Sequence, residues 1–210
     1  MKVCVFGATG PTGRHLVRLA LEAGHDVVAA CRRPEMLEMA HERLEKRRAD
    51  VFEAASVADA LVGCDAVLSA LGMRSGERDR PVYSEGMGHI LAAMAAQGVP
   101  RLLAVTAAGL EPSPDYKLPW IFRAIIEPLF LKPVFADMRR MEALVREANI
   151  DWTLVRPPGL VAGRPRGRWQ ARAGVGVPGS AQIDRADLAA FMVHELSEGA
   201  WVRQGVAVAW

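Results

Sequence analysis

Cysteine is scarce in this 210-residue sequence, and net charge is almost absent. The three cysteines, Cys4, Cys31 and Cys64, are too few and too widely spaced for a disulfide framework or a zinc site. Each lies in or beside an apolar stretch, so we expect buried thiols and a reducing, cytoplasmic compartment. The 26 basic and 24 acidic residues leave a formal charge of +2 without a long basic run, which argues against binding to duplex nucleic acid.

The first half of the chain does contain a regular alternation of short apolar segments and amphipathic segments. The apolar segments predict strands, at residues 1–6, 26–31, 47–51, 65–71 and 101–106. Helices are expected between them, at residues 12–23, 36–44, 56–62 and 82–97. Because alternating strands and helices with short links form parallel sheets, the fold class is α/β, with a doubly wound, Rossmann-type parallel sheet.

The alternation becomes looser after residue 106. Helices are predicted there at residues 135–148 and 184–198, and strands at residues 151–156 and 205–210. No internal repeat and no linker separates this half from the first. We therefore expect a single domain over residues 1–210, with elaborations at about 107–135 and 159–182.

A glycine-rich loop, Gly-Ala-Thr-Gly-Pro-Thr-Gly, lies between the first predicted strand and the first predicted helix. Gly7 permits a tight turn, Gly10 lets the backbone approach a pyrophosphate, and Gly13 lets the helix pack close to the strand. The helix start offers free N–H groups and a positive dipole end to phosphate. The order of strand, loop and helix therefore predicts a dinucleotide site that includes Gly7, Thr9, Gly10, Pro11, Thr12 and Gly13.

The end of the second strand selects between the two nicotinamide dinucleotides. An acidic residue there would hold the ribose 2′-hydroxyl of NAD. This chain has Arg32 and Arg33 instead, with no carboxylate before Glu35. Two guanidinium groups suit a 2′-phosphate, so NADP(H) is preferred over NAD(H), unless both arginines are simply solvated.

The ends of the later strands complete the expected cofactor site, because ligands bind at the carboxyl ends of parallel strands. Asp50 and Val51 would reach the adenine, although a plain surface carboxylate is an alternative for Asp50. The fourth strand ends beside the cofactor, and the fifth and sixth strands end at the nicotinamide. The residues predicted at these positions are Asp50, Val51, Leu71, Gly72, Met73, Thr106, Ala107, Pro157 and Pro158.

With these residues in place, the chain resembles the atypical short-chain dehydrogenases/reductases with NAD(P)-binding, NmrA-like folds, and among them the biliverdin-IX-beta (flavin) reductases. The resemblance covers nearly the whole chain. It rests on the glycine loop, Arg32, Asp50-Val51, residues 84–86, the pair Met141-Glu142, and residues 152–158. It implies that Thr12 contacts phosphate, that Arg32 contacts the 2′-phosphate, and that Thr106 and Pro157-Pro158 lie at the nicotinamide.

The chain departs from the flavin-reductase pattern at two positions. Ala107 stands where that pattern has serine, and Gly159 stands where it has histidine. Two polar groups near the substrate are therefore missing. This keeps open the alternative of an NmrA-like regulator that senses NADP without reducing a substrate.

Short-chain dehydrogenases generally use a Tyr-x-x-x-Lys pair, which this chain lacks. Met87 follows Tyr83 at that spacing, and Trp120 follows Tyr116. Reduction of a flavin or quinone needs less from the protein, because the cofactor carries the chemistry. Thr106 is the candidate catalytic group near the ring, with a purely structural strand-end residue as the alternative. The five histidines show no metal-ligand spacing, so no metal site is predicted.

The most apolar segment, residues 119–135, includes Arg123, Glu127, Lys132 and two prolines. A membrane-spanning helix needs about 20 largely uncharged residues. We therefore expect no membrane span, and consider the segment as a lid over the substrate, a dimer surface or core. The protein would be a monomer or a homodimer.

These observations predict an NADPH-dependent oxidoreductase that transfers hydride to a flat acceptor such as a flavin, quinone or tetrapyrrole. Its partner is then a small-molecule substrate and not a nucleic acid. Four arginines surround Trp169 in a glycine-rich stretch, and we interpret them as a solvated face. They are Arg164, Arg166, Arg168 and Arg172.

Overall fold

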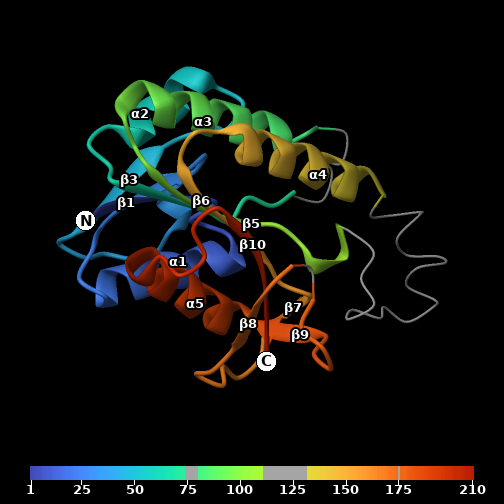
Figure 1. Cartoon of the computed structure of the whole chain (residues 1–210). Helices are drawn as coiled ribbons and strands as arrows, with labels where there is room; N and C mark the ends of the chain where they lie inside the picture. The colour runs from blue at the N-terminus through green and yellow to red at the C-terminus, as the bar shows by residue number, and fades with distance from the viewer. Residues whose placement is uncertain (74–79, 111–131, 175) are drawn as a thin grey trace.

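The computed structural model describes residues 1–73, 80–110, 132–174 and 176–210, and its centre is a twisted sheet (Figure 1). Within these residues eight strands form the sheet, in the order β3-β2-β1-β4-β5-β6-β10-β8. All neighbouring strands are parallel except β8, which runs antiparallel to β10. The strands are β1 Lys2–Phe6, β2 Asp26–Cys31, β3 Leu44–Arg48, β4 Ala66–Ser69, β5 Arg101–Val105, β6 Asp151–Arg156, β8 Gln170–Ala173 and β10 Gln204–Ala209. The first six strands have the order 3-2-1-4-5-6 of dinucleotide-binding folds, which confirms the predicted doubly wound sheet.

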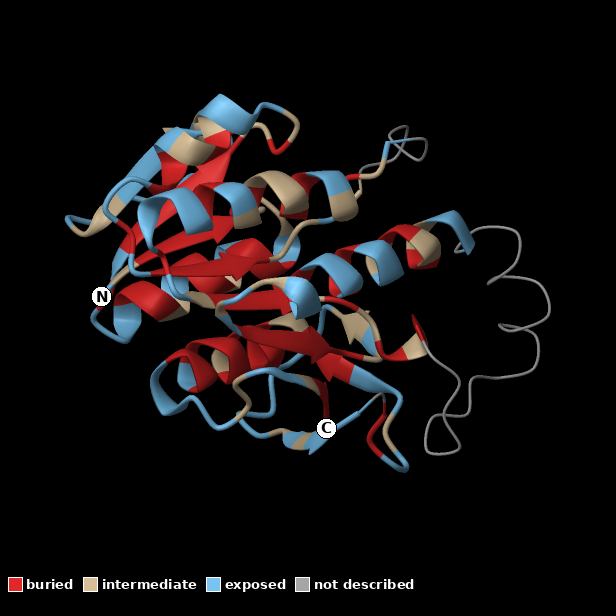
Figure 2. Cartoon of the chain, turned by 45° about the horizontal axis from the view of Figure 1, so that its top comes forward, coloured by how far each residue is buried: buried red, intermediate tan, exposed pale blue. Residues whose placement is uncertain are grey.

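Helices cover both faces of the sheet. In Figure 1, α1 (Pro11–Glu22) and α5 (Arg185–Glu198) lie below it, whereas α2 (Ala54–Leu61), α3 (Ser84–Gln97) and α4 (Lys132–Glu147) lie above it. Alternate residues of β1 enter separate cores: Val3 and Val5 pack with α1 and α5, and Cys4 and Phe6 pack with α2 and α3. The central strands are buried throughout, and the outer faces of the helices are exposed (Figure 2).

A second, two-stranded sheet lies beside the first. It consists of β7 (Gly159–Val161) and β9 (Gln182–Asp184), which run parallel. Asp184 then caps α5, where its carboxylate accepts a hydrogen bond of 2.7 Å from the N–H of Ala186. The predicted elaboration at 159–182 therefore contains β7, β8 and the start of β9.

Two predictions around the edge strand are wrong. The strand expected at residues 47–51 lies at Leu44–Arg48, because its largely exposed sequence Leu-Glu-Lys-Arg-Arg gives no apolar signal. The helix expected at residues 36–44 is a single 3-10 turn, η1 (Pro34–Met36), after which Leu37 enters the core. The residues between this turn and β3 connect the turn to the edge of the sheet, so they do not continue as a helix. The other boundaries shift by a few residues at most, and strands 26–31 and 151–156 are as predicted.

The cysteines and the apolar segment complete the comparison. Cys4, Cys31 and Cys64 are free and buried, as expected. Residues 119–131 of the segment interpreted as lid, dimer surface or core lie outside the described residues, as does Tyr116. No helix in the described part of the chain is long and apolar enough to cross a membrane.

Candidate functional site

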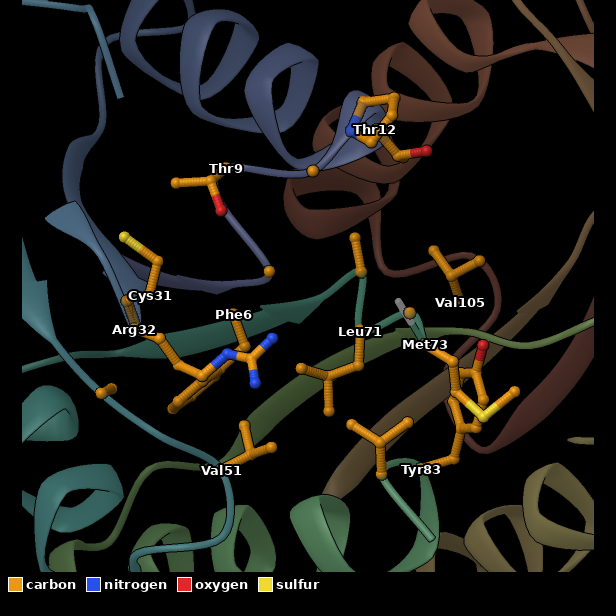
Figure 3. Close-up of a pocket in the computed structure, with 18 of the residues that line it drawn as sticks. Phe6, Thr9, Thr12, Cys31, Arg32, Val51, Leu71, Met73, Tyr83 and Val105 are labelled. Carbon is orange, nitrogen blue, oxygen red and sulfur yellow. The ribbon is translucent and has the colours of Figure 1, made fainter. Parts of the chain in front are cut away.

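A cavity of about 460 Å³ opens at the carboxyl ends of β1, β2, β4 and β5 (Figure 3). This edge contains the point between β1 and β4 where the strand order reverses, which is where doubly wound folds bind ligands. Most of the predicted cofactor residues meet there. Those that line the cavity are Gly7, Thr9, Gly10, Pro11, Thr12, Arg32, Asp50, Val51, Leu71, Gly72, Met73 and Thr106. Those outside its lining are Gly13, Arg33, Ala107, Pro157 and Pro158.

The glycine loop forms one wall, and two of its glycines are required by contact. Gly7 has φ of +76°, and a Cβ there would overlap the carbonyl oxygen of Ala70. Gly13 lies behind the wall, where a Cβ would overlap the carbonyl oxygen of Gly7. The N–H of Gly10 closes the turn on that same carbonyl at 2.9 Å. Gly13 therefore acts through helix packing rather than by lining the cavity.

The start of α1 faces the cavity without a side-chain cap. Gly10 is the N-cap residue and Pro11 follows at the first helical position. Because the N-cap glycine supplies no side-chain acceptor, the backbone N–H groups of the first turn can serve an anion. Gly10 lines the cavity, and a Cβ there would meet only the Gly7 oxygen, at 3.1 Å, so the space beside this residue is largely open.

Arg32 supplies positive charge at the end of β2. Its half-buried side chain lines the cavity and points into it (Figure 3). Arg33 is exposed and lies outside the lining. Sequence reasoning missed Arg14, whose guanidinium donates to the carbonyl oxygens of Thr9 at 3.1 Å and Met36 at 2.6 Å. Arg14 thus ties the glycine loop to the turn that follows Arg32.

Asp50 and Val51 form the neighbouring wall after β3. The Asp50 carboxylate accepts a hydrogen bond of 3.1 Å from the N–H of Phe52, which stabilises the local turn. The carbonyl oxygen of Val51 lies 2.8 Å from Nδ1 of His89 on α3. Local hydrogen bonds therefore hold this wall in place, and Asp50 has a structural role in addition to any contact with a ligand.

The opposite end of the cavity is mostly apolar. Residues from widely separated parts of the chain meet there: Met73, Val82, Tyr83, Val105, Thr106, Met138 and Leu160. Tyr83 is 6% exposed, and its ring enters the cavity near Met73 and Val105 (Figure 3). No lysine follows Tyr83 at the Tyr-x-x-x-Lys spacing, so that pattern gives no reason to expect Tyr83 in the cavity. Its position just before the predicted Ser84-Glu85-Gly86 motif is the signal that could have found it.

A buried ion pair lies behind Thr106. Arg156 Nε donates to Glu142 Oε1 at 2.9 Å, and Arg156 Nη2 donates to Glu142 Oε2. Burial raises the pKa of Glu142, but hydrogen bonds and charge from Arg156 outweigh it and hold that pKa below its usual range. The nearby Thr106 hydroxyl contributes to this lowering. Its Oγ1 is buried and finds no partner of normal hydrogen-bond geometry among the described residues.

Pro157 and Pro158, predicted at the nicotinamide, are not among the residues that line the cavity. The carbonyl oxygen of Pro157 instead accepts a hydrogen bond of 2.9 Å from the N–H of Ala108. This contact joins the segments that follow β5 and β6. Among the described residues, no cluster of His, Cys, Asp and Glu has the proximity of a metal site.

Comparison with known proteins agrees with this geometry. A family model described as NAD(P)H-binding matches residues 7–199, and the chain belongs to that family. A Streptococcus pneumoniae protein suggested to be an NADH-flavin reductase is 25% identical, with a TM-score of 0.79 over 100% of this chain and 99% of that chain. A short-chain dehydrogenase/reductase of Veillonella parvula, solved with NADP, is 17% identical and shares the fold, with a TM-score of 0.82 over 100% and 94%.

A sequence relative is much longer than this chain. An uncharacterised protein of Mycobacterium tuberculosis is 27% identical over 173 residues, which is 82% of this chain and 16% of that protein. The chain therefore matches only a small part of this relative. The family model therefore identifies an NAD(P)H-binding protein, and the structural neighbours share its fold.

Proposed function

We propose that the protein is an NADPH-dependent oxidoreductase that transfers hydride to a flat acceptor such as a flavin, quinone or tetrapyrrole. One observation carries the proposal. A single cavity connects the uncapped start of α1 and Arg32 with an apolar end that contains Tyr83 and Thr106. The likeness to the suggested NADH-flavin reductase of Streptococcus pneumoniae supports the reaction class.

Each part of the cavity suits a different part of a nicotinamide dinucleotide phosphate. Uncapped N–H groups of α1 suit a pyrophosphate, and Gly10 leaves room for it. The guanidinium of Arg32 suits a 2′-phosphate. When bound, the nicotinamide supplies the hydride. The chain then binds the phosphates, orients the ring against β4 and β5, and excludes water with Met73, Val105 and Met138.

Replacement of Arg32 by alanine tests the cofactor preference. We expect the Kd for NADPH to rise about 10- to 100-fold and the Kd for NADH to change less than about 3-fold. A charge-assisted hydrogen bond contributes about 1.5–3 kcal/mol, and only NADPH carries the 2′-phosphate. Fluorescence titration of both dinucleotides measures the difference.

A matched variant for this titration is Arg18→Ala. Arg18 is an exposed arginine of α1 that pairs with Glu22 at 2.7 Å and lies outside the cavity lining. Its removal should leave both dissociation constants unchanged. Equal losses of NADPH and NADH affinity in Arg32→Ala would show that Arg32 does not recognise the 2′-phosphate.

Turnover by the unmodified protein tests the enzyme itself. We expect NADPH to be consumed in the presence of at least one of FMN, menadione and biliverdin, followed as loss of absorbance of the reduced nicotinamide. Measured NADPH binding without turnover of any acceptor would contradict the proposal. That result would support the NADP-sensing alternative, which the missing polar side chains at Ala107 and Gly159 favour.

A further inference from the structure

The Tyr83 phenol lies at the apolar end of the cavity, on a stretch of backbone that a buried carboxylate anchors. Its backbone N–H donates to Asp137 Oδ2 at 2.9 Å, and the N–H of Ser84 donates to Asp137 Oδ1 at 3.2 Å. Asp137 lies on α4 and is 5% exposed, so a buried carboxylate anchors the start of α3. The ring of Tyr83 is thereby directed into the cavity (Figure 3).

The Tyr83 hydroxyl is a hydrogen-bond donor that lacks an acceptor in the described part of the chain. Burial raises its pKa, and a hydrogen bond from the Met73 backbone only partly opposes that rise. The phenol therefore keeps its proton and acts as a donor rather than as a base. Thr106 Oγ1, at the same end, is buried and has no partner of normal hydrogen-bond geometry among the described residues. Buried hydroxyls are nearly always paired, so the unsatisfied Thr106 oxygen, beside a phenol that keeps a proton to donate, indicates a polar ligand atom at this end of the cavity.

Charge divides the cavity into two ends. Among its described lining residues, the charged side chains are Arg32 and Asp50, both at the end formed by β2 and β3. The end that contains Tyr83 is otherwise lined by apolar side chains and Thr106. An anionic group would lose its hydration there without a compensating charge, whereas a neutral ring with carbonyl oxygens would not.

We infer that Tyr83 donates a hydrogen bond to a carbonyl oxygen of the acceptor, and that this end of the cavity takes neutral ring carbonyls of the quinone class. The inference rests on the proposed function and deepens it. Negative charge develops on a quinone oxygen as the ring accepts hydride. A donor already fixed in an apolar site stabilises that charge without reorganisation.

The experiment compares Tyr83→Phe with the unmodified protein, using menadione as the probe. Menadione affinity is measured in the presence of NADP⁺, so that binding is observed without reduction. We expect the Kd for menadione to rise about 5-fold or more, and kcat/KM for menadione to fall about 10- to 100-fold. The Kd for NADPH should stay within about 2-fold, since the phenol contacts the acceptor.

Ser84→Ala is the matched control. It removes the neighbouring hydroxyl, which donates to Asp137 and lies outside the cavity lining. This variant should bind and reduce menadione as the unmodified protein does. An equal effect of both substitutions would mean that disturbance of α3, and not the loss of the phenol donor, causes the change.

The remaining outcomes separate this inference from the proposed function. Active unmodified protein with unaltered menadione binding and turnover in Tyr83→Phe would overturn the role of Tyr83. Loss of NADPH affinity in that variant would assign the hydroxyl to the cofactor and would also overturn it. Reduction of FMN or biliverdin but not menadione would overturn the quinone class. Absence of turnover with every acceptor would overturn the proposed function itself.

Discussion

Replacement of Gly13 by alanine should lower the free energy of unfolding by about 3 kcal/mol or more and abolish NADPH binding. A Cβ at Gly13 would overlap the carbonyl oxygen of Gly7 and lie 2.7 Å from its carbon and 2.9 Å from Cα of Ala8. All three are backbone atoms, so no side chain can move aside. The start of α1 would have to separate from β1. The cavity wall that the glycine loop forms, where the phosphates are proposed to bind, would then be disrupted.

Urea denaturation followed by circular dichroism measures the loss, and Gly88→Ala is its control. A Cβ at Gly88 in α3 meets nothing within 4 Å. Because alanine favours a helix over glycine, this variant should gain about 0.5–1 kcal/mol and keep its NADPH affinity. If Gly13→Ala proved as stable as Gly88→Ala, the close contact between α1 and β1 would not be required.

Gly10→Ala separates binding from folding within the same loop. Its Cβ would meet only the Gly7 oxygen, at 3.1 Å, so the protein should fold. The methyl group would occupy space that a pyrophosphate needs, and NADPH affinity should fall about 10-fold or more. Normal affinity in a folded Gly10→Ala protein would place the phosphates elsewhere. The two variants thus test different requirements for glycine: space for the pyrophosphate at Gly10, and close packing of α1 against β1 at Gly13.

The central strands could be predicted because a parallel sheet buries both faces of its strands. β1 and β2 are therefore nearly continuous apolar runs that are followed by a glycine or an arginine, and their bounds lie within one residue of those predicted. β3 lies at the edge and carries charged residues, so its signal resembles that of a loop. Its position follows from pairing with β2, which periodicity alone does not reveal.

The site could be predicted where a residue directly follows a strand. The glycine loop, Arg32 and residues 71–73 follow β1, β2 and β4, and parallel strands bring their carboxyl ends to one edge. Met138 and Leu160 reach the cavity through the docking of α4 and β7, which no local pattern encodes. The Tyr-x-x-x-Lys pattern gives no role to Tyr83, because Met87 stands where a catalytic lysine would be expected. The Tyr-x-x-x-Lys spacing tests for one catalytic mechanism only, and it does not indicate whether the tyrosine side chain lines a cavity.

The buried pair of Glu142 and Arg156 should be the other stability-determining feature near the site. Glu142 is 4% exposed and Arg156 is 3% exposed. Their bidentate contact joins α4 to β6, and Arg156 Nη1 also donates to the carbonyl oxygen of Gly174 at 3.3 Å. Glu142→Gln would leave a buried guanidinium without the carboxylate that neutralises it. We expect a loss of about 3 kcal/mol in the free energy of unfolding at pH 7.

Arg146→Ala offers a control on the same carboxylate. Arg146 Nη2 lies 3.2 Å from Glu142 Oε2, but its side chain is 44% exposed. Solvent screens such a pair, so its removal should cost about 0–1 kcal/mol. Urea denaturation of both variants at pH 7 measures the contrast. Equal costs would mean that burial of the Arg156 pair adds nothing to its contribution.

Acid provides an independent test of the charge on Glu142. Its pKa is held below the usual range in the folded protein, so its stabilising effect is full above the pKa of the unfolded chain, about 4.3. That effect is lost as the pH falls through the lower, folded-state pKa, because the protonated acid is then neutral like glutamine. The stability difference between the unmodified protein and Glu142→Gln should therefore shrink below about pH 4. A difference that stayed constant down to the acid transition would assign the effect to shape rather than to charge.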